Sequence, residues 1–224
     1  MKVMPRKKRE LTEDIKNRLL KIDPATIGHW LQFGFMNSRI KAMVNNIKVV
    51  GSAFTVKTTS IDSVMVHKAV SLAREGDILV IDRNGDEKYA CVGEIIVYAA
   101  KKRNLAGIIV DGPITDIQSV RELNFPVYST GLSPVTTRLV GNTGEINTTI
   151  QCGGVTVEPG DTILGDDNGL LVLSKDLNIQ EWLLKAEEKE AMEKIMKDKI
   201  DQGLPLASIT KADQLLRESG ITFE

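Results

Sequence analysis

The segment from Gly76 to Asp116 constrains the fold more than any other part of this 224-residue chain. It begins with GDILVID, a short run of Ile, Leu and Val after a Gly-Asp turn, which is typical of a fully buried strand. A second run of the same kind, LAGIIVDG, follows and is expected to end in a turn at Asp111 to Pro113. Two buried strands separated by one helix-length segment predict a βαβ unit with parallel strands.

The segment between the two strands predicts a helix that begins at Gly93. Glu94 lies in its first turn and a basic run, Lys101 to Arg103, lies in its last, so the charges complement the helix dipole at both ends. Asp116 follows the second strand and starts another predicted helix. In open α/β sheets, ligands bind at the carboxyl ends of the strands, where helix N–H groups are free. We therefore expect the N–H groups from Gly93 onward and the Asp116 carboxylate to lie at one ligand site.

Each of these residues also has a simpler structural interpretation. Gly93 can be only a helix-start glycine, and Glu94 can serve only the helix dipole. Asp116 is an ordinary helix N-terminal residue on sequence alone. The two histidines, His29 and His67, are isolated in the sequence and are predicted to pack or to face solvent.

The remaining pattern predicts a single domain, residues 1–224, of mixed α/β class. Residues 11–22 are a predicted amphipathic helix, and residues 178–224 are a predicted helical extension that opens with a long charged helix. Between residues 131 and 173, many Gly, Thr, Asn and Asp residues separate short β runs, which predicts antiparallel strands with tight turns. No linker precedes this β-rich part, so we expect it to share one core with the βαβ unit.

Composition argues against several classes of function. The formal net charge is −1, so no general cationic field exists and nucleic acid is not expected as a direct partner. The two cysteines, Cys91 and Cys152, have no metal-site spacing, and the longest apolar runs are far below the roughly 20 residues of a membrane span. The N-terminal positive charges have no apolar stretch behind them, so we predict no secretion signal and a cytoplasmic protein.

Three stretches occur in a specific order along the chain: Gly93 to Ile96, AGIIVDGPITD from Ala106 to Asp116, and VTVEPGDTILGDDNGLLVL from Val155 to Leu173. Together they resemble the RraA-like family, which contains regulators of ribonuclease E activity and class II, divalent-metal-dependent 4-hydroxy-4-methyl-2-oxoglutarate aldolases. The likeness covers a core of about residues 24–173. It implies a swivelling β/β/α fold like that of phosphohistidine domains. It also implies a homotrimer, sometimes paired into a homohexamer, with the site between neighbouring subunits.

The resemblance also implies roles for the residues of the predicted ligand site. Asp116 matches the family aspartate that holds Mg²⁺ or Mn²⁺, so it is the expected metal residue. Glu94 matches an acidic residue that the family separates by twenty residues from an Arg-Asp pair. The turn formed by Gly93, Glu94, Ile95 and Ile96 matches the backbone cradle for the carboxylate of a 2-oxo acid substrate.

Two positions depart from the family motif. Thr115 stands where the family has arginine, and Ser119 stands where an acidic residue is expected. The missing arginine matters most, because a guanidinium binds a carboxylate through two charge-assisted hydrogen bonds, each worth about 1.5–3 kcal/mol. Threonine offers one neutral hydroxyl for the substrate. A ligand that needs a positive charge here would have to bind a cationic side chain from another position, and Arg83 and Lys57 are the candidates.

Two functions of different classes follow. The first is a metal-dependent lyase that cleaves a 2-oxo acid to pyruvate or decarboxylates oxaloacetate, in both cases through an enolate that the ion stabilises as a Lewis acid. In this mechanism Glu94 is the base or orients a water that takes the substrate proton. The second is a non-catalytic RraA-like protein, either a ribonuclease regulator with a protein partner or a small-ligand binder. Thr115 and Ser119 favour the second function, whereas Gly93, Glu94 and Asp116 favour the first.

Overall fold

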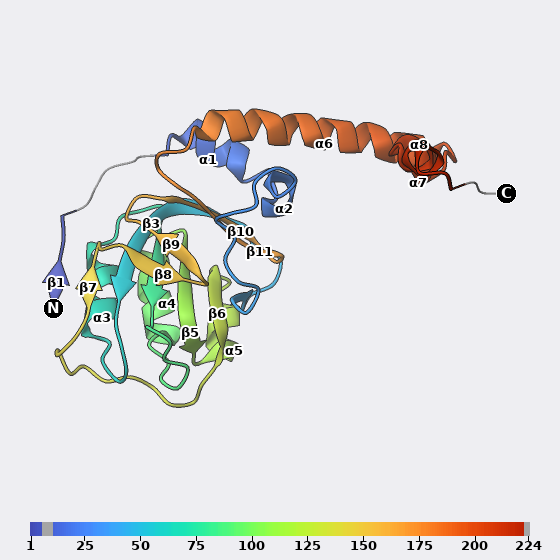
Figure 1. The fold of residues 1–224 in the computed structure, drawn as a ribbon. Helices are drawn as coiled ribbons and strands as arrows, with labels where there is room; N and C mark the ends of the chain where they lie inside the picture. The colour runs from blue at the N-terminus through green and yellow to red at the C-terminus, as the bar shows by residue number, and fades with distance from the viewer. Residues whose placement is uncertain (6–10, 222–224) are drawn as a thin grey trace.

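The computed structural model describes residues 1–5 and 11–221, so the basic run from Arg6 to Arg9 in the N-terminal segment lies outside the described residues. A central sheet has the strand order β1-β7-β3-β4-β5-β6-β2, with the hairpin of β10 and β11 joined to β3, and β8 and β9 form a separate pair. Helices flank the central sheet, which confirms the predicted mixed α/β class (Figure 1). The strands are β1 (Lys2–Val3), β2 (Lys41–Ala42), β3 (Val49–Lys57), β4 (Asp77–Asp82), β5 (Gly107–Ile114), β6 (Val127–Leu132), β7 (Glu145–Ile146), β8 (Ile150–Cys152), β9 (Val155–Val157), β10 (Thr162–Asp166) and β11 (Gly169–Leu173).

The helices agree with the predicted ones in most places. The helix predicted at residues 11–22 is shorter at both ends, and the Thr12 hydroxyl caps it by accepting the N–H of Ile15. A short helix near residue 206 was not predicted. The helices are α1 (Glu13–Leu19), α2 (Pro24–Ile27), α3 (Val64–Leu72), α4 (Glu94–Lys102), α5 (Ile117–Glu122), α6 (Ile179–Asp201), α7 (Leu206–Ile209) and α8 (Ala212–Glu218).

The predicted βαβ unit is present as β4, α4 and β5, with β4 and β5 parallel in one sheet. The predicted turn at Asp111 to Pro113 is wrong, because β5 continues through these residues to Ile114. Pairing with β6 is irregular between Val110 and Pro113 and then resumes. A proline has no N–H to donate, and an irregularity of this kind is where a sheet tolerates it.

Alternate side chains of β4 explain the layers of the fold. Leu79 and Ile81 point to one face of the sheet, where they share a core with α3, α4 and α5. Ile78 and Val80 point to the opposite face and pack with buried residues of β8 and β9. The resulting order, helices on a central sheet on a small β-hairpin, is the β/β/α arrangement expected above (Figure 1).

The β-rich part is joined to the βαβ unit through β3, which is a single strand with two different neighbours on one side. Its first half pairs with β10, for example Ser52 with Thr162, and its second half pairs with β7, for example Val56 with Ile146. Both pairings are antiparallel, whereas β3 and β4 are parallel. The two parts of the chain therefore form one sheet and share its core, as expected.

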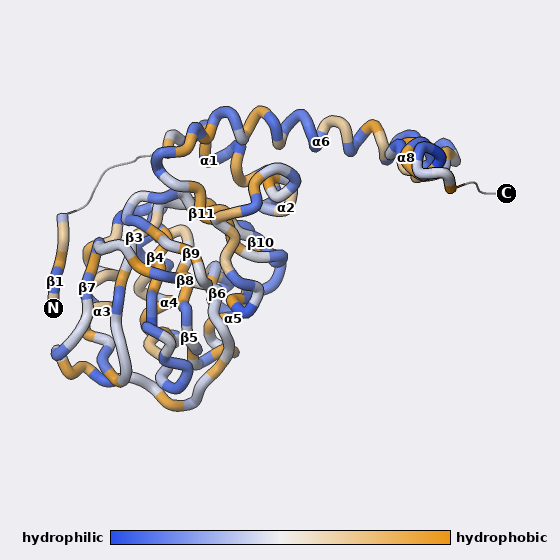
Figure 2. The backbone as a smooth tube through the Cα atoms, viewed as in Figure 1, coloured by the Kyte–Doolittle hydropathy of each residue, from blue (hydrophilic) through white to orange (hydrophobic). Residues whose placement is uncertain are grey.

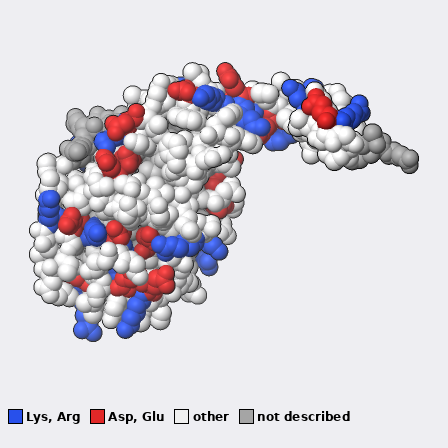
Figure 3. All heavy atoms as spheres, in the orientation of Figure 1, with Lys and Arg blue, Asp and Glu red and all other residues white. Residues whose placement is uncertain are grey.

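The C-terminal helices form an arm, defined as residues 179–218, that packs on the body only near its start. Three side chains of α6, Ile179, Leu183 and Ala186, are buried in a cluster with α1, α2, β10 and β11. Beyond Ala186 the helix projects away from the body and carries α7 and α8 at its far end (Figure 1). Hydrophobic residues still recur along this exposed part, interspersed with charges of both signs (Figures 2 and 3). None of the helices among the described residues has the length and apolar character needed to cross a membrane.

Candidate functional site

The ends of β4 and β5 bring Gly93 and Asp116 together, as predicted. One oxygen of the Asp116 carboxylate, Oδ2, accepts the backbone N–H of Glu94 at 3.0 Å. The other oxygen, Oδ1, accepts the hydroxyl of Thr115 at 3.3 Å. The N–H of Thr115 in turn donates to the carbonyl oxygen of Val92, so the two segments are linked at the backbone as well.

Gly93 is required by space and not by its backbone angles. Its φ of −144° is extended backbone that any residue adopts. A Cβ atom at Gly93 would lie 2.4 Å from Oδ2 of Asp116 and 2.8 Å from Cγ2 of Thr115, both closer than real Cβ contacts. The missing side chain therefore leaves the room in which the Asp116 carboxylate reaches the first N–H of α4.

Asp116 adopts a backbone conformation that is uncommon for a residue with a side chain. It caps α5 with φ 56° and ψ 39°, in the left-handed region. Asp and Asn tolerate this region better than other side chains, and non-glycine residues in it cluster at functional sites. The conformation turns the chain sharply after β5 and places an exposed carboxylate beside α4.

The first turn of α4 keeps free donors next to this carboxylate. The N–H of Glu94 is bonded to Asp116, but the N–H groups of Ile95 and Ile96 have no acceptor among the described residues. The first N–H groups of any helix lack an intrahelical partner, and together with the helix dipole they favour an anion. The N–H groups of Ile95 and Ile96 are therefore available to an anion, and their role as a substrate cradle stays a prediction.

A cavity of about 250 Å³ lies against these groups. Its wall comes from the start of α3, the segment from Ala90 to Ile96, the end of β5 and a loop segment at residues 136–139. Of the predicted site residues, Gly93, Ile95, Ile96, Thr115 and Asp116 line it. The side chain of Glu94 is exposed and is not among the lining residues, so the structure brings only its N–H into the site.

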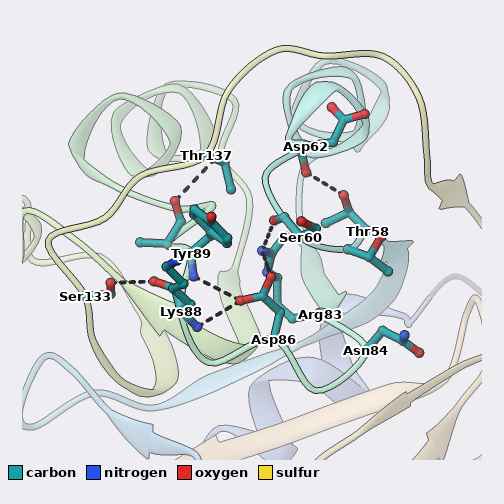
Figure 4. A network of polar contacts seen from close by, with 12 residues as sticks. Thr58, Ser60, Asp62, Arg83, Asn84, Asp86, Lys88, Tyr89, Ser133 and Thr137 are labelled. Carbon is teal, nitrogen blue, oxygen red and sulfur yellow. Dashed lines mark hydrogen bonds and ion pairs between the residues drawn. The ribbon is translucent and has the colours of Figure 1, made fainter.

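A polar framework behind the cavity holds its loops in place (Figure 4). The guanidinium of Arg83, which is fully buried, donates to the Ser60 carbonyl oxygen at 2.5 Å and pairs with Asp86 at 3.3 Å. Asp86 accepts the N–H groups of Lys88 and Tyr89, which lead directly into the cavity wall. These contacts tie the segments before α3 and after β4 to one another.

The cavity wall at residues 136–139 belongs to a loop that is hydrogen-bonded to two other segments of the chain. The Thr137 N–H donates to the Ala90 carbonyl oxygen at 3.1 Å, and the Thr137 hydroxyl lies 3.4 Å from the same oxygen (Figure 4). The Arg138 N–H donates to the Ile61 carbonyl oxygen, and the Arg138 carbonyl oxygen accepts the N–H and the hydroxyl of Ser63. The path of this loop is thus set by contacts with segments distant in the sequence.

The strongest of the contacts that hold this loop are made by Asp62. Its buried carboxylate accepts four backbone N–H groups, from Val64, Val140, Asn142 and Thr143, at 2.7–3.4 Å. Burial alone would raise the pKa of Asp62, but hydrogen bonds from backbone N–H groups outweigh it and lower the pKa to about 2. Asp62 thus caps the N–H of Val64 at the start of α3 and also holds the loop.

Neither cation proposed from the sequence reaches the cavity. Arg83 is enclosed in the framework, with Nε and Nη1 lacking a partner among the described residues, and Lys57 lies on β3 outside the cavity wall. The cavity is lined instead by Arg138 and by His67, which sequence reasoning set aside. His67 lies four residues after Ser63, and this helical spacing could have indicated a shared face. Arg138 carries no such local signal.

The other lining residue of chemical interest, Cys91, is inert. It is buried, and burial raises the pKa of its thiol to about 11 against the opposing effect of nearby Arg83. The thiolate, which is the reactive form, is therefore scarce at neutral pH.

The residues at the site fit a hard divalent cation held by few protein ligands. Among the described residues, no three His, Cys, Asp or Glu side chains form a metal-binding group. Asp116 offers two exposed oxygens, each with one hydrogen bond, and a carboxylate has about four acceptor positions. Mg²⁺ commonly keeps several waters and binds through one or two carboxylates plus substrate oxygens, which this single carboxylate permits.

Comparisons with known proteins identify the family of the chain. A family model described as RraA-like, Aldolase/RraA, matches residues 25–172. A protein of Halalkalibacterium halodurans named "Putative 4-hydroxy-4-methyl-2-oxoglutarate aldolase" is 40% identical over 156 residues, which is 70% of this chain and 73% of the relative. An uncharacterized protein of Methanocaldococcus jannaschii is 33% identical over 173 residues, 76% of this chain and 82% of the relative.

Solved structures show the same architecture. An uncharacterized protein from Pseudomonas syringae matches with a TM-score of 0.79 at 22% identity. The match covers 93% of this chain and 98% of the other, and at this identity it shows a shared fold only. RraAS2 of Streptomyces coelicolor, described as an unusual member of the RNase ES inhibitor RraA protein family, has a TM-score of 0.75 at 26% identity. That match covers 85% of this chain and 99% of the other.

Proposed function

Given that the chain belongs to the RraA-like family, we propose that it is a divalent-metal-dependent lyase acting on a small 2-oxo acid. The reaction is retro-aldol cleavage of a 4-hydroxy-4-methyl-2-oxoglutarate-type substrate to pyruvate, with oxaloacetate decarboxylation as a related activity. One observation carries the proposal: the Asp116 carboxylate and the free first-turn N–H groups of α4 converge on one cavity, joined by the Glu94 N–H contact of 3.0 Å. The relatives named as aldolases support it.

Each residue of the cavity has a defined task in this reaction. Asp116 holds Mg²⁺ or Mn²⁺, which when bound supplies Lewis-acid stabilisation of the negative charge that develops on the 2-oxo group. The N–H groups of Ile95 and Ile96 receive the adjacent carboxylate and fix the orientation of the 2-oxo acid. Gly93 leaves the space that the Asp116 carboxylate occupies against α4, and the Thr115 hydroxyl holds the second oxygen of Asp116.

The bond changes of the reaction also require a group that accepts a proton. In the retro-aldol step the C4 hydroxyl loses its proton, the C3–C4 bond breaks, and its electron pair moves toward the 2-oxo oxygen. Because Glu94 is exposed beside the cavity and does not line it, its proposed task is to orient a water that accepts the hydroxyl proton. Glu94→Gln is expected to slow turnover, and an unchanged rate would remove Glu94 from the mechanism.

The central test is Asp116→Asn, assayed by pyruvate release with the metal-depleted protein, with Mg²⁺ and with Mn²⁺. Asn tolerates the left-handed conformation, and its amide oxygen can still accept the Glu94 N–H, so stability should change by less than about 0.5 kcal/mol. Turnover should fall at least about 100-fold, since the charge that holds the ion is gone. Asp201→Asn, on an exposed residue at the end of α6, is the matched control. Equal turnover of the wild type with and without metal would contradict the proposal.

A second candidate function is a non-catalytic regulator, as the description of the Streptomyces relative suggests for its family. The specific observation in its favour is that Thr115 and Ser119 replace the arginine and the acidic residue expected in the aldolase motif. If no metal supports pyruvate release from either substrate, inhibition of ribonuclease E-type cleavage by the purified chain becomes the decisive measurement. An oligomer with the site between neighbouring subunits remains a prediction under either function.

A further inference from the structure

The cavity next to Asp116 has one permanent cation among its described lining residues, and that cation is Arg138. It comes from the loop that follows β6, whereas the family motif would place a guanidinium at Thr115 at the end of β5. Thr115 cannot replace that charge, because its hydroxyl is neutral and donates to Asp116. A guanidinium is therefore present at this cavity, but on a different wall.

The Arg138 side chain is free to bind a ligand. It is exposed, and no ion pair or hydrogen bond of its guanidinium is found among the described residues. Several other arginines of the body are engaged: Arg18 binds Glu187, Arg39 binds Asp111, and Arg83 binds Asp86. Arg138 thus stands out as a cation that lines the cavity and whose guanidinium forms no ion pair among the described residues.

The backbone that carries Arg138 is held firmly. Its N–H and carbonyl oxygen are bonded to Ile61 and Ser63, and the next turn of the loop is fastened by Asp62 through Asn142 and Thr143. A charged side chain on a fixed backbone loses less freedom when it binds a ligand than one on an unfastened loop. This positioning is what a specificity-determining residue requires.

The two anion-binding features of the cavity lie on different segments. The free N–H groups of Ile95 and Ile96 adjoin Asp116, where the carboxylate next to the 2-oxo group binds in the proposed function. Arg138 lines the cavity from the 136–139 segment, and a guanidinium is a planar fork of N–H donors that suits a carboxylate. A cavity of about 250 Å³ limits the ligand to a small acid.

We infer that Arg138 binds the second carboxylate of a dicarboxylic 2-oxo acid, so that the site selects 2-oxo dicarboxylates over 2-oxo monocarboxylates. This inference rests on the proposed function, whose substrates are dicarboxylic 2-oxo acids, and adds the residue that distinguishes them from monocarboxylic ones. Because Arg138 is exposed, solvent weakens each of its hydrogen bonds, and the expected contribution is about tenfold in affinity.

The test measures binding of 2-oxoglutarate and of pyruvate to the full chain in the presence of Mg²⁺, by calorimetry. Arg138→Gln should weaken 2-oxoglutarate about tenfold and leave pyruvate unchanged within about twofold, because only the first has a second carboxylate. Arg138→Lys keeps the charge without the fork and should recover part of the loss. Arg74→Gln, which removes an exposed cation at the far end of α3, should change neither.

The outcomes separate this inference from the proposed function. Equal weakening of both ligands in Arg138→Gln would place the guanidinium on the carboxylate that they share, and no weakening of either would show that Arg138 is not a ligand; both results overturn the inference. If the wild type also releases pyruvate from oxaloacetate, the proposed function survives either result. A wild type that binds neither ligand with Mg²⁺ overturns the inference and the proposed function together. Thermal unfolding of the variant checks that the fold is intact.

Discussion

The loop that closes the cavity and the C-terminal arm both leave the central sheet, but they are held in different ways. Residues 136–143 of the loop contain mostly exposed side chains and are fixed through backbone N–H and carbonyl groups, with the buried carboxylate of Asp62 as the main acceptor. The arm is held at its start mainly by three buried apolar side chains, with the ion pair of Arg18 and Glu187 beside them, and none of the residues of α7 or α8 is buried.

The difference shows which part of the chain has a backbone held in a defined position. Hydrogen bonds are directional, so a loop fixed by its own backbone keeps a definite path and presents Arg138 at a definite place. Apolar contact is non-directional, so the arm is attached without its far end being positioned by the body. Three measurements test this comparison between the loop and the arm.

The largest effect is expected from Asp62→Ala. It removes one carboxylate that accepts four backbone N–H groups and leaves those donors to find water in a mostly enclosed place. The free energy of unfolding should fall by about 3–4 kcal/mol in urea denaturation. Asp201→Ala, in the exposed end of α6, should stay within about 0.5 kcal/mol of the wild type. A loss below about 1 kcal/mol would mean that the loop does not depend on Asp62.

A somewhat smaller effect is expected at the attachment of the arm, where two neighbouring leucines form a matched pair. Leu183 is fully buried in the cluster with α1 and α2, so Leu183→Ala should cost about 3 kcal/mol through lost burial and a residual cavity. Leu184 is 55% exposed, and Leu184→Ala should change the free energy of unfolding by less than about 0.5 kcal/mol. Similar costs for the two variants would show that the exposed face of α6 at Leu184 is covered in solution.

The smallest of the three effects is pH-dependent and belongs to the loop alone. The folded-state pKa of Asp62, about 2, lies below its ordinary value of 3.8, so its contribution to stability is complete above about pH 4 and is lost as the pH falls toward 2. The full contribution is about 2 kcal/mol. The difference in unfolding free energy between wild type and Asp62→Asn should therefore shrink over this range. A difference that stays constant from pH 5 to pH 2.5 would exclude the Asp62 charge as its source.

Several elements were predictable because their signals are local. The buried run of β4, the glycine-led helix α4 with acidic and basic ends, and α8 follow from residues adjacent in the sequence. The convergence of Gly93 and Asp116 was also predictable, since parallel strands that enclose a helix must end at the same edge of the sheet. The end of β5 was predicted wrongly, because the Asp-Gly-Pro turn signal was overridden by pairing with β6.

The sequence by itself determined the βαβ unit, the order of helices and strands around it, and the carboxylate and free N–H groups at its edge. Only the tertiary structure decided which cation reaches that edge and why residue 93 is glycine. Arg138 arrives at the cavity through contacts such as that between Asp62 and Asn142, which are 80 residues apart. The space at Gly93 is needed because Asp116, 23 positions later in the sequence, fills it (116 − 93). Local patterns specify local conformation, whereas the path of a loop depends on long-range hydrogen bonds that no short segment encodes.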